Sequence, residues 1–149
     1  MEGKRPSMIQ SRGLVLDANI LLRAVFGIRA LALIESYEGS VRFYAPDVCF
    51  RDARKYIPGI AAKRGMDAET CFVALDGIAK IVDSVDLSLY EDFEAMALLR
   101  IASRDVDDWP VVATALLLNA PIWTEDRDFF GTGIATWTSS RVEIFLMGE

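Results

Sequence analysis

The sequence predicts an α/β domain with a mainly parallel sheet. Short apolar segments alternate with helical patterns along the 149 residues, which is typical of this class. Wholly apolar runs such as GLVL at residues 13–16 suit strands that are covered on both faces. No internal repeat and no Pro-, Gly- or Ser-rich linker divides the chain. We therefore expect a flexible lead-in at residues 1–12 and one domain at residues 13–149.

In the first half of the chain, strands are expected at residues 13–16 and 41–45. Helices are expected at residues 20–26, at residues 29–38, and from Pro46 to about residue 60. The first strand is continuously apolar and the second alternates in polarity, whereas the helices repeat apolar residues every three or four positions. Gly39 is a suitable stop for the second helix, and proline is tolerated in the first turn of the third.

In the second half, strands are expected at residues 81–85, 121–123 and 134–137. Helices are expected at residues 67–79, 89–103 and 111–119, and residues 142–147 predict a last short strand or helix. The helix at 89–103 is amphipathic and begins with acidic residues, which the helix dipole favours. The helix at 111–119 is almost continuously apolar, so we expect protein to enclose it on most sides.

The composition excludes several classes of protein. No apolar run reaches the roughly 18 residues that span a membrane, and the N-terminus lacks the apolar region of a secretory signal, so we expect a cytoplasmic protein without a membrane partner. The chain has no histidine, which removes Ser-His-Asp and Cys-His nucleophiles. Cys49 and Cys71 are expected to be buried free thiols. A net charge of −6 argues against nucleic-acid binding over the whole surface but permits a local basic rim.

Acidic residues gather in residues 104–130, RDVDDWPVVATALLLNAPIWTEDRDFF. They are Asp105, Asp107 and Asp108 before the apolar helix, and Glu125, Asp126 and Asp128 after the fourth strand. Right-handed crossovers would bring the carboxyl ends of strands one and four to one edge of the sheet. Asp17 and Asp126 would then lie at that edge, where open α/β sheets bind their ligands, and Asp108 could reach it from the start of its helix.

Each acidic residue also has a local structural interpretation. Asp17 suits the N-cap of the following helix as well as it suits a site. Asp47 is better explained by its favourable position at a helix N-terminus. Asp52 projects towards the buried side of its helix, which indicates either a site residue or a salt bridge with a neighbouring basic residue.

Convergence of these residues would have a chemical consequence. Four carboxylates, those of Asp17, Asp52, Asp108 and Asp126, would repel one another and raise their pKa values if they met. A hard divalent cation such as Mg²⁺ or Mn²⁺ relieves that repulsion and prefers oxygen ligands. One or two such ions can activate water for a displacement at phosphorus, and this chemistry needs no histidine.

At these positions the sequence resembles the PIN-domain family of metal-dependent ribonucleases, whose best-known members are toxins of bacterial and archaeal toxin–antitoxin pairs. The family's first motif matches LVLDAN, with Asp17 and Asn19. The third matches DDWPVVATAL, with Asp108. The fourth matches IWTEDRDFF, with Thr124 and Asp126, and with Asp128 as a frequent accessory.

The second motif departs from the family pattern. The family usually has glutamate on the helix after strand two, and the matching position in PDVCFRDARKYI is Asp52. Aspartate is one methylene shorter, so the carboxylate would reach an ion through water. Asp47 and Asp105 are the alternative residues for this role.

The resemblance implies a three-layer α/β/α sandwich with a central, mainly parallel sheet of about five strands. It implies a Mg²⁺- or Mn²⁺-dependent endoribonuclease with catalytic residues Asp17, Asp52, Asp108 and Asp126, of which Asp17, Asp108 and Asp126 hold the metal. Supporting roles fall to Asn19, Thr124 and Asp128. RNA, an antitoxin protein and a second copy of the chain are the expected partners.

Basic residues near these positions could hold RNA phosphates at the rim of the pocket. They are Arg51, Arg54, Lys55, Arg104 and Arg127. Each of them, taken singly, is better explained as a solvated charge. The sequence leaves two alternatives to the nuclease. One is a PIN-like binding module with weak or no catalysis, which Asp52 and the acidic net charge favour. The other is an aspartyl phosphatase, which Asn19 disfavours because a second aspartate is needed there.

Overall fold

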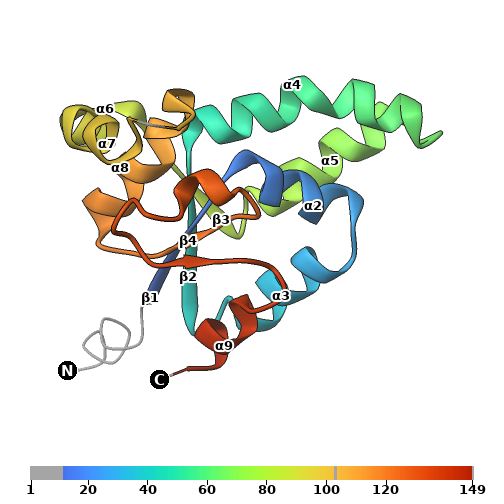
Figure 1. Cartoon of the computed structure of the whole chain (residues 1–149). Coiled ribbons are helices and arrows are strands. Elements are labelled where there is room, and N and C mark those ends of the chain that lie inside the picture. The colour runs from blue at the N-terminus through green and yellow to red at the C-terminus, as the bar shows by residue number, and fades with distance from the viewer. Residues whose placement is uncertain (1–11, 103, 149) are drawn as a thin grey trace.

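Five parallel strands form the central sheet, in the order β3–β2–β1–β4–β5 (Figure 1). In this computed structural model, which describes residues 12–102 and 104–148, the strands are β1 (Arg12–Leu16), β2 (Val41–Pro46), β3 (Val82–Val85), β4 (Ile122–Trp123) and β5 (Thr136–Trp137). The chain moves outward from β1 to β2 and β3, and then returns to the other side of β1 for β4. The point where the direction reverses lies between β1 and β4, and α/β sheets bind ligands at such a point.

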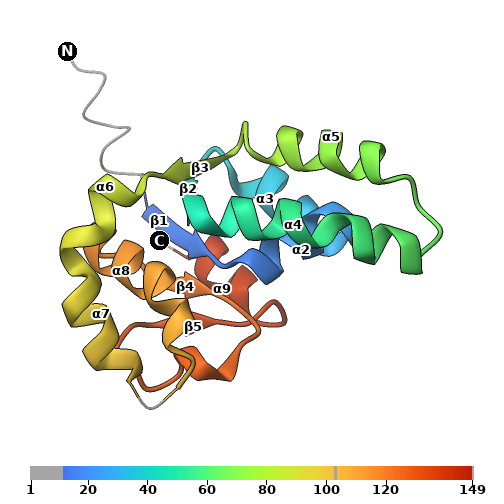
Figure 2. The same ribbon diagram turned by 90° about the horizontal axis from the view of Figure 1, so that it is seen from above.

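Helices cover both faces of the sheet, as Figure 2 shows. One layer contains α2 (Ala18–Phe26), α3 (Arg29–Tyr37), α4 (Asp47–Lys63) and α5 (Ala68–Ile78). The other contains α6 (Leu87–Tyr90), α7 (Glu94–Ile101) and α8 (Trp109–Leu118), while α9 (Val142–Met147) lies against α3 through Arg29 and Glu143. The expected three-layer α/β/α sandwich with a parallel sheet is therefore confirmed.

The most apolar segments of the sequence lie in the middle of this sandwich. Leu14, Val15 and Leu16 of β1 are fully buried because β1 has a strand on each side and a helical layer on each face. The first turns of α8 are buried from Pro110 to Ala115, as expected for a helix enclosed by protein. The two cysteines are buried free thiols, which confirms that prediction.

The expected helix at residues 89–103 forms three shorter pieces instead. Asp86 caps α6 by accepting a hydrogen bond from the amide of Ser88, so the helix begins earlier than expected. A 3-10 turn at Glu91–Phe93 then separates α6 from α7, which ends at Ile101. The buried ring of Tyr90 explains the break, because its hydroxyl is held by Asp47 of α4, far away in the sequence.

The two ends of the described chain are in contact with each other. Arg12 begins β1, one residue before the expected start of that strand. Its guanidinium donates hydrogen bonds to the carbonyls of Phe145 at 2.6 Å and Leu146 at 3.0 Å, and it covers the Phe145 ring. Residues 142–147 are a helix rather than a strand. The rest of the lead-in prediction, residues 1–11, lies outside the described residues.

Candidate metal centre at the carboxyl edge of the sheet

Asp17 stands at the end of β1, where it caps a helix and also contacts the residue that follows β4. One carboxylate oxygen accepts a hydrogen bond from the amide of Ile20 at 3.0 Å, which makes Asp17 the N-cap of α2. The other accepts a short hydrogen bond from the hydroxyl of Thr124, at the end of β4. The side chain is only 6% exposed. The cap interpretation of Asp17 is therefore confirmed, and its role in a site stays a prediction that the second oxygen leaves possible.

Thr124 connects Asp17 to the acidic turn that follows β4. Its fully buried hydroxyl donates to Asp17 and accepts a hydrogen bond from the amide of Asp126 at 2.9 Å. Asp126 in turn caps the 3-10 turn Arg127–Phe129 by accepting from the amide of Asp128 at 2.9 Å. This line of hydrogen bonds fixes the backbone around Asp126 and Asp128 relative to β1.

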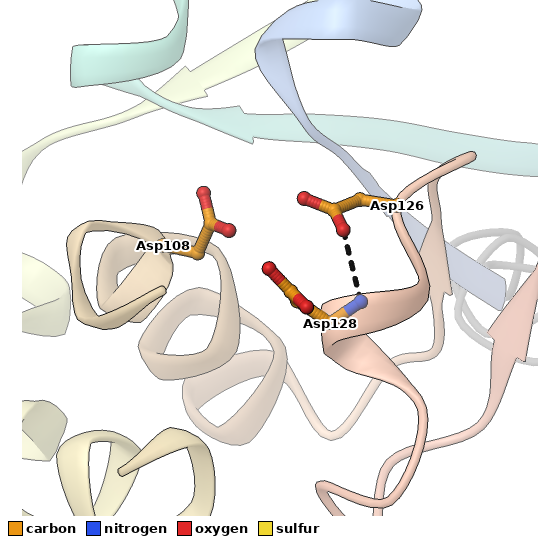
Figure 3. Close-up of side chains that lie close together, drawn as sticks. All are labelled: Asp108, Asp126 and Asp128. Atoms are coloured by element: carbon orange, nitrogen blue, oxygen red, sulfur yellow. Dashed lines mark hydrogen bonds between the residues drawn. The ribbon is translucent and has the colours of Figure 1, made fainter. Parts of the chain in front are cut away.

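Three carboxylates meet across this edge, as Figure 3 shows. Asp108, Asp126 and Asp128 each place one oxygen within 4.8 Å of the others. Asp108 comes from the other side, where a 3-10 turn (Val106–Asp108) leads into α8. Its Oδ2 atom is buried and has no hydrogen-bond partner among the described residues. A buried carboxylate oxygen without a donor is costly, and a bound cation would satisfy it.

The charges at this edge raise the pKa values of the buried carboxyls. The pKa of Asp108 rises to about 7, chiefly because of burial and then because of the nearby charges of Asp105 and Asp126. Burial also raises the pKa of Asp17 to about 6, although the hydrogen bonds from Thr124 and Ile20 oppose that rise. Both carboxyls therefore ionise at a higher pH than an ordinary aspartate, Asp108 most of all, and a divalent cation would favour their charged forms. The donor set of hard oxygen ligands fits Mg²⁺ or Mn²⁺.

Asp52 lies near this edge but outside the compact group. It is half-buried on α4, one turn after Cys49. Burial raises the pKa of the Cys49 thiol well above its usual range, and the charges of Asp17 and Asp52 add to that rise. The alternative interpretation, a salt bridge with a neighbouring basic residue, is not supported, because the described ion pairs leave Asp52 out and pair Arg54 with Asp76 at 2.6 Å.

Asp47 and Asp105 have structural roles instead. The carboxylate of Asp47 accepts hydrogen bonds from the Tyr90 hydroxyl at 2.7 Å and the Leu87 amide at 3.1 Å, so it joins the start of α4 to α6. Asp105 accepts from the amide of Asp107 and caps the turn before α8. The structural interpretation of Asp47 is thereby confirmed.

The remaining predicted residues are spread more widely. Asn19 is exposed and lines a groove beside the site rather than the compact group. Arg51 and Arg127 are exposed. Arg54 forms an ion pair with Asp76 and lies over the ring of Phe72, both on α5, so it has a structural role.

Two further basic residues have identifiable neighbours. The ammonium of Lys55 lies 5.8 Å from the centre of the Tyr56 ring. Arg104 lies beside the turn that follows Phe129, because a Cβ placed on Gly131 would come within 2.9 Å of its Nη2 atom. These positions do not test whether the basic residues hold RNA phosphates, so that role stays a prediction.

The carboxylate of Asp128, to which the resemblance assigns a supporting role, belongs to the compact group, whereas that of Asp17 does not. The available signal was the spacing of Asp126 and Asp128, because an aspartate that accepts a hydrogen bond from the amide two residues later closes a tight turn. Such a turn keeps both side chains close together.

Comparison with known families and structures places this geometry in context. The family model described as the PIN domain matches residues 15–147. The chain belongs to the PIN-domain family. Proteins of this family are generally nucleases that use divalent metal ions, and this PIN domain has a cluster of three carboxylates that could hold one.

Solved structures share the fold at low sequence identity. The crystal structure of PAE2754 from Pyrobaculum aerophilum is similar with a TM-score of 0.70 and 12% identity, over 93% of this chain and 91% of that one. VapBC2 from Rickettsia felis, bound to a DNA fragment from their promoter, is similar with a TM-score of 0.66 and 11% identity, over 85% of this chain and 98% of that one. Comparison with curated protein sequences gives no significant match. Within the described residues of this PIN domain, no helix is both long and apolar enough to cross a bilayer.

Proposed function

We propose that this PIN domain is a Mg²⁺- or Mn²⁺-dependent endoribonuclease. The observation that carries the proposal is the buried, unpartnered Oδ2 of Asp108, which lies beside the carboxylates of Asp126 and Asp128. These groups occupy the switch point of the sheet, the usual ligand position in α/β folds. A carboxylate cluster of this kind is stable with all its members ionised only when a cation joins it.

In this proposal some residues bind the ion, and others hold those ligands in position. Asp108, Asp126 and Asp128 supply the oxygens that bind it. When bound, the ion lowers the pKa of an attached water and stabilises charge at phosphorus, so that phosphodiester hydrolysis proceeds without histidine. Asp17 fixes the Thr124 hydroxyl, and Thr124 fixes the amide of Asp126. Such outer contacts orient metal ligands and affect metal affinity strongly.

Asp17 and Asp52 are the other two members of the proposed catalytic set, and both lie outside the compact group of three carboxylates. The charge of Asp17 raises the pKa values of both Asp108 and Cys49, which supports a role for its carboxylate beside the proposed ligands. Asp52 is the residue that corresponds to the usual glutamate of the family. We propose that it acts through water or through a second ion, because it lies outside the compact group.

We further propose that the chain is the toxin of a toxin–antitoxin pair. The structural likeness to VapBC2, together with membership of the PIN-domain family, supports this assignment. An antitoxin protein would then be its partner in the cell, and the cytoplasm its place of action. Exposed apolar side chains on α6 and α7 favour a homodimer, and these are Leu87, Leu89, Met96 and Leu99.

The direct test is cleavage of RNA by purified protein with and without added Mn²⁺. The wild type is expected to cleave only with metal, and Asp108→Asn is expected to remove that activity. Asp83→Asn is the matched control, because Asp83 is paired with Arg42 on β2 and β3, away from the site. Metal-dependent activity that survives in Asp108→Asn, in a preparation free of contaminating nuclease, contradicts the proposal.

A binding module without catalysis is the second candidate, and the position of Asp52 favours it. If the glutamate of the family is needed for catalysis, the shorter side chain leaves the site incomplete. Calorimetric titration with Mn²⁺ separates the two candidates. Absence of binding at millimolar metal would favour the module, and binding with cleavage would favour the nuclease.

A further inference from the structure

The two sides of the candidate metal centre come from separate parts of the chain. Asp108 lies between α7 and α8, which pack against each other (Figure 2). Asp126 and Asp128 belong to the turn that follows β4. The oxygens of the three carboxylates lie within 4.8 Å of one another only while these two sides keep their spacing. A contact that joins the two sides therefore bears on how the centre binds an ion.

Arg100 makes such a contact. It lies in the last turn of α7, and its Nη1 atom donates a hydrogen bond to the carbonyl of Thr132 at 2.7 Å. Thr132 is 2% exposed, and its hydroxyl donates to the carbonyl of Phe129 at 2.8 Å. Phe129 is fully buried and ends the 3-10 turn that contains Asp128. Two successive hydrogen bonds thus connect α7 to the backbone of the acidic turn.

The loop that follows the acidic turn is shaped to receive this contact. Gly133 has a φ of +84°, and a Cβ at that position would lie 2.5 Å from Nη1 of Arg100. Gly131 has a φ of +89°, and a Cβ there would lie 2.9 Å from Nη2 of Arg104. Glycine is the residue that adopts such a backbone conformation without strain and allows a close approach. The loop therefore lacks a side chain at both points where a guanidinium comes close.

The acidic turn is consequently held from two directions. On the β1 side, the Thr124 hydroxyl accepts a hydrogen bond from the amide of Asp126. On the α7 side, Arg100 holds the loop through Thr132. A hydrogen bond from a charged donor is about twice as strong as one between neutral groups. The contact of Arg100 is therefore strong enough to fix the turn relative to α7.

We propose that Arg100 is a positioning residue of the metal centre. By holding the turn of Asp126 and Asp128 to α7, it sets their distance from Asp108, so that the three carboxylates bind one cation together. Arg100 is not itself a ligand, because a guanidinium carries no acceptor. The inference rests on the proposed function, in which these carboxylates hold a divalent ion. Residues that orient metal ligands affect affinity about tenfold to a hundredfold when they are removed.

The test measures the Kd for Mn²⁺ by isothermal titration calorimetry. Arg100→Ala is expected to raise the Kd about tenfold, and Arg100→Lys, which keeps one charged donor, about threefold. Loss of a positive charge near a cation site would by itself strengthen cation binding. A rise in Kd therefore distinguishes positioning from a charge effect. Arg42→Ala is the matched control, because Arg42 is an exposed arginine paired with Asp83 away from the site, and its Kd should equal that of the wild type.

Urea unfolding in EDTA separates positioning from a general loss of stability. Arg100 is exposed, so its removal leaves the core intact, and a merely structural role would lower stability without changing the Kd. Thr132→Val is the second variant and decides the question if Arg100→Ala fails to fold. It removes the hydroxyl that donates to Phe129 while nearly keeping the shape of the side chain, and it too should raise the Kd.

The double variant Arg100→Ala/Thr132→Val should raise the Kd by less than the product of the two single effects, because both residues act through one line of hydrogen bonds. A wild-type Kd, or a lower one, in the folded Arg100→Ala protein overturns the proposal. A wild-type Kd in Thr132→Val overturns it as well.

The positioning role and the nuclease can fail separately. Metal-dependent RNA cleavage, together with an unchanged Kd in both variants, would overturn the role of Arg100 and leave the nuclease in place. Binding of Mn²⁺ that depends on Arg100, without any cleavage of RNA, would overturn the nuclease and leave the positioning role in place. A wild type that binds no Mn²⁺ overturns both.

Discussion

Acidic residues occupy two regions of this domain, and their surroundings differ. Around β3 and the start of α4, each carboxylate has a donor. Asp47 accepts from Tyr90 and Leu87, Asp83 pairs with Arg42 at 3.1 Å, and hydrogen bonds from Ser88 lower the pKa of Asp86. At the carboxyl edge of β1 and β4, the pKa values of Asp17 and Asp108 are raised instead.

The difference shows that the number of acidic residues does not identify a site. Both regions are rich in aspartate, but only at the carboxyl edge does burial exceed the supply of donors. The first region uses its carboxylates to hold helices and strands together. The carboxylates of the second region have too few hydrogen-bond donors, so they favour a bound cation. Well-packed neighbouring residues hold these carboxylates in place despite the cost of burying them. Substitutions should therefore have opposite effects in the two regions.

The largest expected effect is on metal affinity at the carboxyl edge. Asp126→Asn removes a charged oxygen from the compact group, so the Kd for Mn²⁺ should rise about a hundredfold, or about 2.7 kcal/mol. Isothermal titration calorimetry measures it, with Asp86→Asn as the control from the other region. Equal affinities in the two variants would remove the distinction between the regions.

The next effect is on stability without metal. Asp108 has a pKa of about 7 when folded and 3.8 as its ordinary value, so the folded state binds more protons between these values and stability falls as pH rises through that window. Asp108→Asn mimics the protonated form. In EDTA it should raise the free energy of unfolding by about 1–3 kcal/mol at about pH 7.5.

Urea unfolding at several pH values checks this result. The gain from Asp108→Asn should shrink towards pH 4, because the wild-type carboxyl is then protonated in both states. A variant that is less stable than the wild type at neutral pH would show that the Asp108 carboxylate is satisfied by the protein itself.

The opposite sign is expected for Asp47→Ala. It removes two hydrogen bonds and leaves the buried Tyr90 hydroxyl without its acceptor, so the free energy of unfolding should fall by about 1–2 kcal/mol. The Kd for Mn²⁺ should stay the same. If metal affinity falls together with stability, Asp47 contributes to the site and the two regions are not independent.

The smallest effect is expected at Asp52, which lies between the two regions on α4. Asp52→Glu restores the longer side chain usual in the family, and initial cleavage rates in Mn²⁺ should rise about threefold to tenfold as the carboxylate comes closer to the ligands. Asp92→Glu, on an exposed 3-10 turn, controls for the added methylene. An unchanged rate would leave Asp52 without a catalytic role.

Much of the fold could be read from the chain because the signals are local. The continuous apolar runs of β1 and α8 indicate burial on all sides, and the structure buries most of both segments. The helix at residues 89–103 could not be read correctly, because Tyr90 is anchored by Asp47 across the fold. A contact with α4 leaves no trace in the amphipathic pattern of residues 89–103 itself.

The candidate site divides in the same way. The motifs located Asp17, Asp108 and Asp126, and the order of the strands brings them to one edge. The motifs did not distinguish Arg54, which is held by Asp76, from Arg100, which holds the loop after the acidic turn. Both are exposed arginines on helices, and only their neighbours in space differ.

The sequence by itself determined the layers, the parallel sheet and the edge at which the carboxylates gather, because apolar periodicity and strand-end positions are properties of neighbouring residues. The tertiary structure decided which carboxylates share a site and which hold the fold together. That choice depends on where donors and cations lie after folding, since a carboxylate is satisfied by groups within a few ångströms regardless of their distance along the chain.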